Sequence, residues 1–166
     1  MDDGHEVDMG ERSSQPPIHI VLVDDDLIDG RLMEKALERR SDIILQYFSS
    51  ASAAQELWRS DVTEQLCHVM LIDLEMPNVD GFELVNIINS RIPSYRRPLL
   101  LAYSGCLNCI GPEALKVFDD AVEKPILMSD LNLMIDGVVK LARDRMSDQK
   151  KALVGPSPRT GLMASH

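Results

Sequence analysis

The fold is decided by residues 21–30, VLVDDDLIDG, where an apolar run passes directly into three consecutive aspartates. Neighbouring carboxylates repel one another and lose favourable hydration when they are buried. A strand end that collects them therefore needs a cation to hold or a helix start to cap. Residues 18–23 are typical of a buried strand, and residues 27–40 have apolar side chains at helical spacing. The first unit is thus predicted to be a strand, a group of acids and a helix.

The same alternation continues along most of the chain. Later apolar runs, separated by amphipathic segments, are IILQYF, HVMLID, PLLLAYS and AVEKP, and a last helix is predicted over residues 128–145. Strands this apolar, joined by crossover helices, predict a doubly wound α/β fold, with a five-stranded parallel sheet covered by helices on both faces. We expect one domain at residues 18–146, with flexible tails at residues 1–17 and 147–166.

Composition and charge exclude several classes of function. The formal net charge is −10, whereas a surface for nucleic acid or for an anionic membrane needs clustered Lys and Arg. No apolar run approaches the roughly 20 residues of a membrane span, and the acidic first residues do not resemble a secretory signal. An odd number of cysteines, three, indicates a reducing compartment. We therefore expect a cytoplasmic protein with a protein partner and no disulfide framework.

Polar side chains follow four of the predicted strands. Asp24 and Asp25 come after the first strand, Asp73 after the third, Ser104 after the fourth and Lys124 after the fifth. Because the carboxyl ends of parallel strands meet at one edge of a sheet, these side chains should converge. Carboxylate oxygens from two strands suit Mg²⁺, and the lysine supplies a built-in counter-charge. The sequence thus predicts an acidic Mg²⁺ pocket.

Four motifs together resemble a known family. They are VLVDDD at the first strand end, LIDLEMPNVDGFEL around Asp73, LLLAYSG at the fourth strand and VEKPI around Lys124. The chain resembles the receiver domain of two-component response regulators, a chemotaxis-regulator-like, flavodoxin-like fold, over residues 18–145. The resemblance implies a phosphoacceptor in a phosphorelay and not an enzyme with a product of its own. Its partners would be a histidine kinase or histidine phosphotransfer protein and a downstream protein target.

The resemblance also implies roles for individual residues. Asp73 would accept the phosphoryl group, and Asp24, Asp25 and Asp73 would hold Mg²⁺ together with the backbone carbonyl of Glu75. Lys124 would pair with the acceptor or with its phosphoryl group. Physical chemistry supports these roles, because a carboxylate can attack phosphorus only where the charge gathering on the transferred oxygens is balanced.

The switch position lies at the end of the fourth strand. The motif LAYSG offers Tyr103 and Ser104 there, and we choose Ser104, because a small hydroxyl followed by Gly105 fits the family's pattern. Its hydroxyl would move to bond a phosphoryl oxygen. The family often has an aromatic residue three positions before the lysine, and this chain has Ala121. The aromatic coupling usual in this fold is therefore missing at its usual place.

Two other functions remain open. A receiver-type adaptor that works without phosphate is compatible with Ala121. A haloacid-dehalogenase-like phosphatase would use Asp24 as nucleophile in an Asp-x-Asp pattern with Asp26, but this leaves DLEMPNVDG unexplained. We interpret Asp26 as the N-cap of the following helix. We interpret CLNC, from Cys106 to Cys109, as small loop residues and not as a redox or metal pair.

Overall fold

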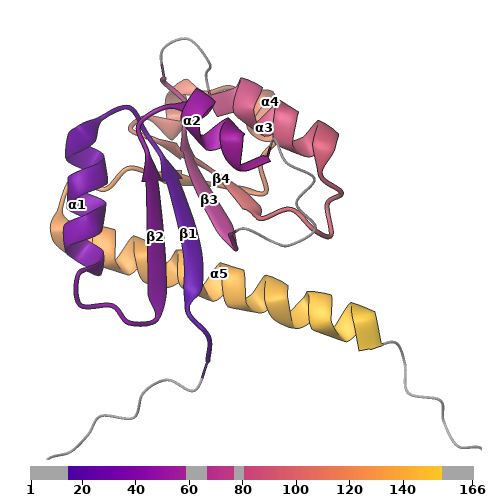
Figure 1. Ribbon diagram of the computed structural model, residues 1–166. Coiled ribbons are helices and arrows are strands. Elements are labelled where there is room, and N and C mark those ends of the chain that lie inside the picture. Colours follow the sequence, from indigo (N-terminus) through magenta and orange to yellow (C-terminus); the bar gives the residue numbers. More distant parts are fainter. Residues whose placement is uncertain (1–14, 59–66, 77–80, 155–166) are drawn as a thin grey trace, which may run out of the picture.

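The computed structural model describes residues 15–58, 67–76 and 81–154. Its centre is one parallel sheet with the strand order β2-β1-β3-β4-β5 (Figure 1). The strands are β1 (Ile18–Val23), β2 (Ile43–Phe48), β3 (Val69–Asp73), β4 (Leu99–Ser104) and β5 (Asp120–Glu123). The predicted fold class is confirmed. Because the chain order reverses between β1 and β3, their carboxyl ends border a crevice that is open to a ligand.

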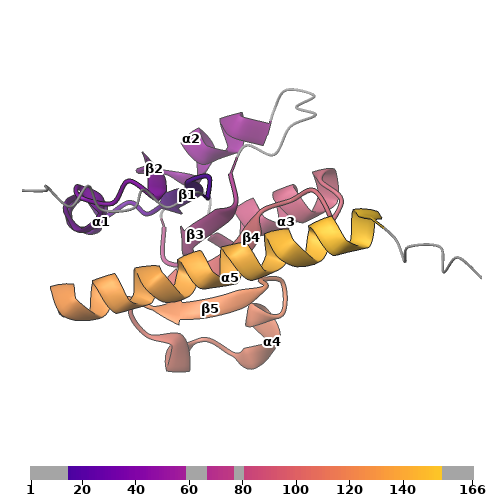
Figure 2. The same cartoon turned by 90° about the horizontal axis from the view of Figure 1, so that it is seen from below.

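Helices cover both faces of this sheet. They are α1 (Leu27–Leu37), α2 (Ala51–Gln55), α3 (Gly81–Arg91), α4 (Pro112–Leu115) and α5 (Met128–Val154), with 3-10 turns η1 (Glu56–Trp58) and η2 (Leu107–Cys109). α1 and α5 pack on one face, and α2 and α3 contact each other on the opposite face. Seen from below, α5 runs across the strands (Figure 2).

Two hydrophobic clusters hold these layers together. Alternate residues of one strand point to opposite faces, so Leu71 of β3 joins the cluster under α1 and α5, and Ile72 joins the cluster under α2 and α3. All residues of β3 are buried. This double burial explains why the central strands are continuously apolar instead of alternating.

The last helix is longer than predicted. We expected a flexible tail from residue 147, but α5 continues to Val154. Residues 147–154 lack glycine and proline, so nothing in their composition ends a helix before Gly155. Arg145 Nη2 donates to the Ser94 carbonyl at 2.8 Å, and Gln149 Nε2 donates to the Tyr95 carbonyl at 3.3 Å. The expected tails at residues 1–14 and 155–166 lie outside the described residues.

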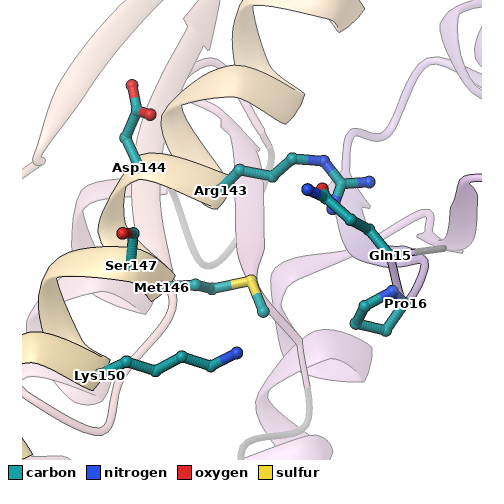
Figure 3. Close-up of a pocket in the computed structure, with 7 residues that line it drawn as sticks. All are labelled: Gln15, Pro16, Arg143, Asp144, Met146, Ser147 and Lys150. Atoms are coloured by element: carbon teal, nitrogen blue, oxygen red, sulfur yellow. The ribbon is translucent and has the colours of Figure 1, made fainter. Parts of the chain in front are cut away.

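A hollow of about 280 Å³ lies where residues 15–16 run along α5 (Figure 3). Its lining residues are Gln15, Pro16, Arg143, Asp144, Met146, Ser147 and Lys150. Because residues 15–16 precede β1, this hollow lies toward the amino end of that strand, away from the acids that follow its carboxyl end.

Candidate functional site

The predicted acidic pocket is present at the carboxyl ends of β1 and β3. Asp24 follows β1 and is fully buried, Asp25 is exposed, and Asp73 is the buried last residue of β3. Each of the three offers a carboxylate oxygen, and these oxygens lie within 4.8 Å of one another. The strands bring them together because β1 and β3 are neighbours in the sheet. Sequence reasoning thus placed these three acids correctly.

The third consecutive aspartate has a different task. The Asp26 side chain accepts a hydrogen bond from the Ile28 N–H at 2.8 Å and forms the N-cap of α1, as predicted. Its own N–H donates to Asp24 Oδ1 at 2.9 Å. The Tyr47 hydroxyl donates to the Asp24 carbonyl oxygen at 2.8 Å. These contacts fix the turn that presents Asp24 and Asp25 to the pocket.

Lys124, just beyond β5, reaches into the pocket. Its Nζ lies 2.7 Å from Asp24 Oδ2, 2.9 Å from Asp29 Oδ2 and 3.5 Å from Asp73 Oδ2. The lysine thus contacts the expected acceptor, but its shorter contacts are to Asp24 and Asp29. Asp29 is a site residue that sequence reasoning missed. The available signal was its place in the first turn of a helix that starts beside the acids.

Burial and charge work against each other in this pocket. Burial raises the pKa of Asp24 to about 6, although the Lys124 ammonium and the Asp26 N–H oppose this rise. Burial alone would lower the pKa of Lys124, but its close contacts with the Asp24 and Asp29 carboxylates hold that pKa above its ordinary value. The ammonium therefore stays charged and serves as a permanent counter-ion.

The donor set fits a divalent cation. Asp24 Oδ2 is buried and has no hydrogen bond of good geometry, although Lys124 Nζ lies 2.7 Å away. A buried carboxylate oxygen normally has its hydrogen-bonding capacity filled, so this atom has room for a further ligand. The Asp24, Asp25 and Asp73 carboxylates offer the hard oxygens that Mg²⁺ prefers.

Glu75 contacts the Asp73 carboxylate through its backbone. Its N–H donates to Asp73 Oδ1 at 3.3 Å, and its side chain is exposed. The chain therefore turns over the Asp73 carboxylate directly after β3. A methyl group at Gly81 would overlap the Asp73 carbonyl oxygen, so the start of α3 approaches this turn more closely than a side chain would allow.

Ser104 ends β4 and is fully buried. Its hydroxyl accepts a hydrogen bond from the Cys106 N–H at 3.2 Å, and its carbonyl accepts one from the Lys124 N–H at 2.8 Å. Tyr103, the alternative that we set aside, pairs in register with Asp73, and its ring centre lies 5.3 Å from Lys124 Nζ. Tyr103 therefore borders the pocket, Ser104 follows it at the end of β4, and Ser104 as the switch hydroxyl stays a prediction.

The expectation of no disulfide was wrong, and Cys106 and Cys109 are more than unconnected loop residues. The structure joins Cys106 and Cys109 by a disulfide, with their Cα atoms 5.4 Å apart. The tight turn η2 creates this proximity, and spacing alone could not distinguish it from an open loop. Cys67 is a free, buried cysteine, and burial raises its pKa to about 12.

Across the described residues, no helix is long and apolar enough to cross a membrane.

Known proteins are similar to this chain in sequence. The two-component response regulator ARR6 of Arabidopsis thaliana is 25% identical, over 77% of this chain and 73% of its own length. The hybrid signal transduction histidine kinase L of Dictyostelium discoideum is 24% identical over 70% of this chain, which corresponds to 7% of that kinase.

Solved structures share the fold. The receiver domain from Methylobacillus flagellatus covers 74% of this chain and 98% of its own, at 24% identity and a TM-score of 0.56. The receiver domain from Methanospirillum hungatei covers 80% of this chain and 98% of its own, at 16% identity and a TM-score of 0.61. The family model described as the response regulator receiver domain matches residues 20–136. The chain therefore belongs to the response regulator receiver domain family of two-component signalling.

Proposed function

We propose that this receiver accepts a phosphoryl group on Asp73 from the phosphohistidine of a histidine kinase or histidine phosphotransfer protein. The observation that carries the proposal is the meeting of Asp24, Asp25 and Asp73 within 4.8 Å, with the Lys124 ammonium 3.5 Å from Asp73. In this arrangement Asp24, Asp25, Asp73 and the Glu75 carbonyl would hold Mg²⁺. The domain is then a phosphoacceptor that assists its own modification.

The chemistry needs position and charge more than acid–base groups. A carboxylate oxygen of Asp73 forms a bond to phosphorus while the bond from phosphorus to the histidine nitrogen breaks. Bound Mg²⁺ would supply positive charge to the transferred oxygens. The Lys124 ammonium adds a second positive charge, and its contacts to Asp24 and Asp29 hold it in place. No separate base is required, because an ionised aspartate attacks directly.

The switching step would begin at Ser104. In the unphosphorylated structure its hydroxyl accepts the Cys106 N–H, and after transfer it would turn to a phosphoryl oxygen. A ligand shifts a conformational equilibrium only through contacts that differ between the two states, and this exchange of partners is such a contact. The altered β4 end would then change the surface that a downstream protein recognises.

Exposed apolar side chains around the pocket support a protein as the donor. Leu27 and Ile28 open α1 on one side, and Ile126 and Leu127 follow Lys124 on the other. Ile126 is 96% exposed and its neighbour Leu127 is 60% exposed, and adjoining exposed apolar side chains are typical of a surface that binds another protein. A hollow of about 490 Å³ continues from Lys124 and Ile126 toward α5. A partner that covers this surface would deliver its phosphohistidine beside Asp73.

The phosphatase alternative is not favoured. It requires the second acid of the Asp-x-Asp pattern to act in the pocket, but the Asp26 carboxylate caps α1 through the Ile28 N–H.

The adaptor alternative would be recognised by its amide chemical shifts. If beryllofluoride with Mg²⁺ shifted only the backbone amides of the pocket, the domain would bind the ligand without switching.

The test of the phosphoacceptor role is a mass measurement. Acetyl phosphate with Mg²⁺ should add one phosphoryl group to the wild type, and none to Asp73→Asn. The control Asp144→Asn removes an exposed carboxylate of α5 away from the pocket and should be modified like the wild type. Equal modification of Asp73→Asn and the wild type would refute the assignment.

A further inference from the structure

We propose that Cys106 and Cys109 are a redox-active pair, oxidised by exchange with a small disulfide such as glutathione disulfide, and that their state controls how firmly the turn after β4 holds Ser104. The coupling to signalling rests on the proposed role of Ser104. The thiol chemistry and the change in the turn do not, and they can be measured without any phosphodonor.

The position of the disulfide makes it accessible. Cys109 is exposed and Cys106 is half-buried, in the turn that includes η2. The sequence separation is three, so the bond closes a very short loop and gains little from restricting the unfolded chain. Exposed disulfides are the ones that exchange with cellular thiols, whereas structural disulfides resist reduction. This bond therefore fits a reversible modification better than a structural staple.

Cys67 provides an internal contrast. It is 1% exposed next to β3, and burial raises its pKa to about 12, so little of it is a nucleophilic thiolate at neutral pH. The same oxidant should therefore leave this thiol unchanged. One chain thus contains an accessible pair and a protected single cysteine.

The exchange is balanced without any other reagent. The Cys109 thiolate attacks one sulfur of glutathione disulfide, which forms a mixed disulfide and releases one glutathione thiolate. The Cys106 thiolate then attacks the Cys109 sulfur, forms the Cys106–Cys109 bond and releases the second glutathione thiolate. The two protons from the cysteines go to the two glutathione molecules. Glutathione in excess reverses the sequence.

The turn connects this chemistry to the switch hydroxyl. The Cys106 N–H donates to Ser104 Oγ at 3.2 Å, so the residue that carries the disulfide also holds the buried hydroxyl. Besides the disulfide, the Cys109 N–H closes the turn on the Cys106 carbonyl at 3.1 Å, and the Ile110 N–H bonds the Leu107 carbonyl at 3.1 Å. Reduction leaves only such hydrogen bonds in a partly exposed turn. The Cys106 N–H should then leave Ser104 more often.

The first experiment measures the redox state. The full chain is equilibrated in buffers of varied glutathione to glutathione disulfide ratio, quenched in acid, unfolded, alkylated and mapped by mass spectrometry. We expect Cys106 and Cys109 to change together from alkylated to disulfide-linked, and Cys67 to be alkylated throughout. The proposal is overturned if the pair stays reduced in the most oxidising buffer or stays linked in glutathione alone.

The second experiment measures the turn. Hydrogen exchange of the Cys106 amide should be about fivefold faster in the reduced form, which corresponds to losing one hydrogen bond of ordinary strength. Cys109→Ser, which cannot form the bond, should exchange at the reduced rate in either buffer. The Leu101 amide inside β4 should exchange equally in both forms. An equal rate for Cys106 in both redox states would overturn the coupling.

The link to signalling has its own readout. Beryllofluoride with Mg²⁺ should bind the oxidised form about fivefold more weakly than the reduced form, because the Ser104 hydroxyl must leave a fixed donor. Equal binding by both forms overturns this link. Binding by neither form would contradict the proposed phosphoacceptor role, while the mass and exchange measurements would still decide the redox proposal.

Discussion

Replacing Lys124 by methionine tests what holds the acidic pocket together. Methionine keeps an apolar stem of similar length but removes an ammonium that lies 2.7 Å from Asp24, 2.9 Å from Asp29 and 3.5 Å from Asp73. Removing one partner of a buried ion pair typically costs about 3–5 kcal/mol, because the other charge is left uncompensated. Asp29 still faces water, so we expect the lower end of this range, about 3 kcal/mol.

Thermal unfolding followed by circular dichroism measures this loss. For a domain of this size about 1 kcal/mol corresponds to roughly 3 °C, so the melting temperature of Lys124→Met in EDTA should fall by about 10 °C. Mg²⁺ should raise the melting temperature of the variant more than that of the wild type. The reason is that the pocket has lost a competing cation, and a ligand that binds only the folded state stabilises it.

The matched control is Lys116→Met. Lys116 pairs with Glu113 on the surface of α4 and its side chain is 67% exposed, so this change should alter the free energy of unfolding by less than about 0.5 kcal/mol. If the two variants unfolded within about 2 °C of each other in EDTA, the pocket would not depend on the ammonium. The electrostatic reasoning behind the site would then be refuted.

Two further predictions, made with three substitutions, test the scaffold. Gly81→Ala should destabilise the domain by at least about 2 kcal/mol, because the new methyl group overlaps the Asp73 carbonyl. Gly137→Ala, in open space on α5, should instead stabilise the domain by up to about 1 kcal/mol. Equal unfolding free energies for the two variants would contradict this prediction. Asp42→Asn should cost about 1 kcal/mol at neutral pH, because the Arg40 bond holds the pKa of Asp42 below its usual 3.8. The stability that this ion pair contributes is present above about pH 4 and is lost as the pH falls through the lowered pKa. Denaturant unfolding should therefore show a smaller difference in unfolding free energy between wild type and Asp42→Asn in acid. A difference that does not change with pH would contradict the assignment.

Local pattern was sufficient for the fold and for most of the pocket. Uninterrupted apolar strands need cover on both faces, and the carboxyl ends of parallel strands always share one edge. The sequence alone could therefore group the charged side chains at the strand ends, which are Asp24, Asp25, Asp73 and Lys124. Asp26 could be recognised as a cap because capping depends only on the residues that follow it. These predictions use information that lies within a few positions of each residue or follows from topology.

The remaining features depend on distances between elements. Asp29 and Lys124 are 95 positions apart, and they come within 2.9 Å only because the start of α1 and the residue after β5 lie at the same edge of the sheet. The disulfide required the actual path of the turn after β4, because residues three apart approach or diverge according to the backbone angles. Sequence alone determined that acids and a lysine meet at one sheet edge. Tertiary structure decided which carboxylates the lysine contacts and that two cysteines are joined beside Ser104, because both depend on side-chain directions that no local pattern specifies.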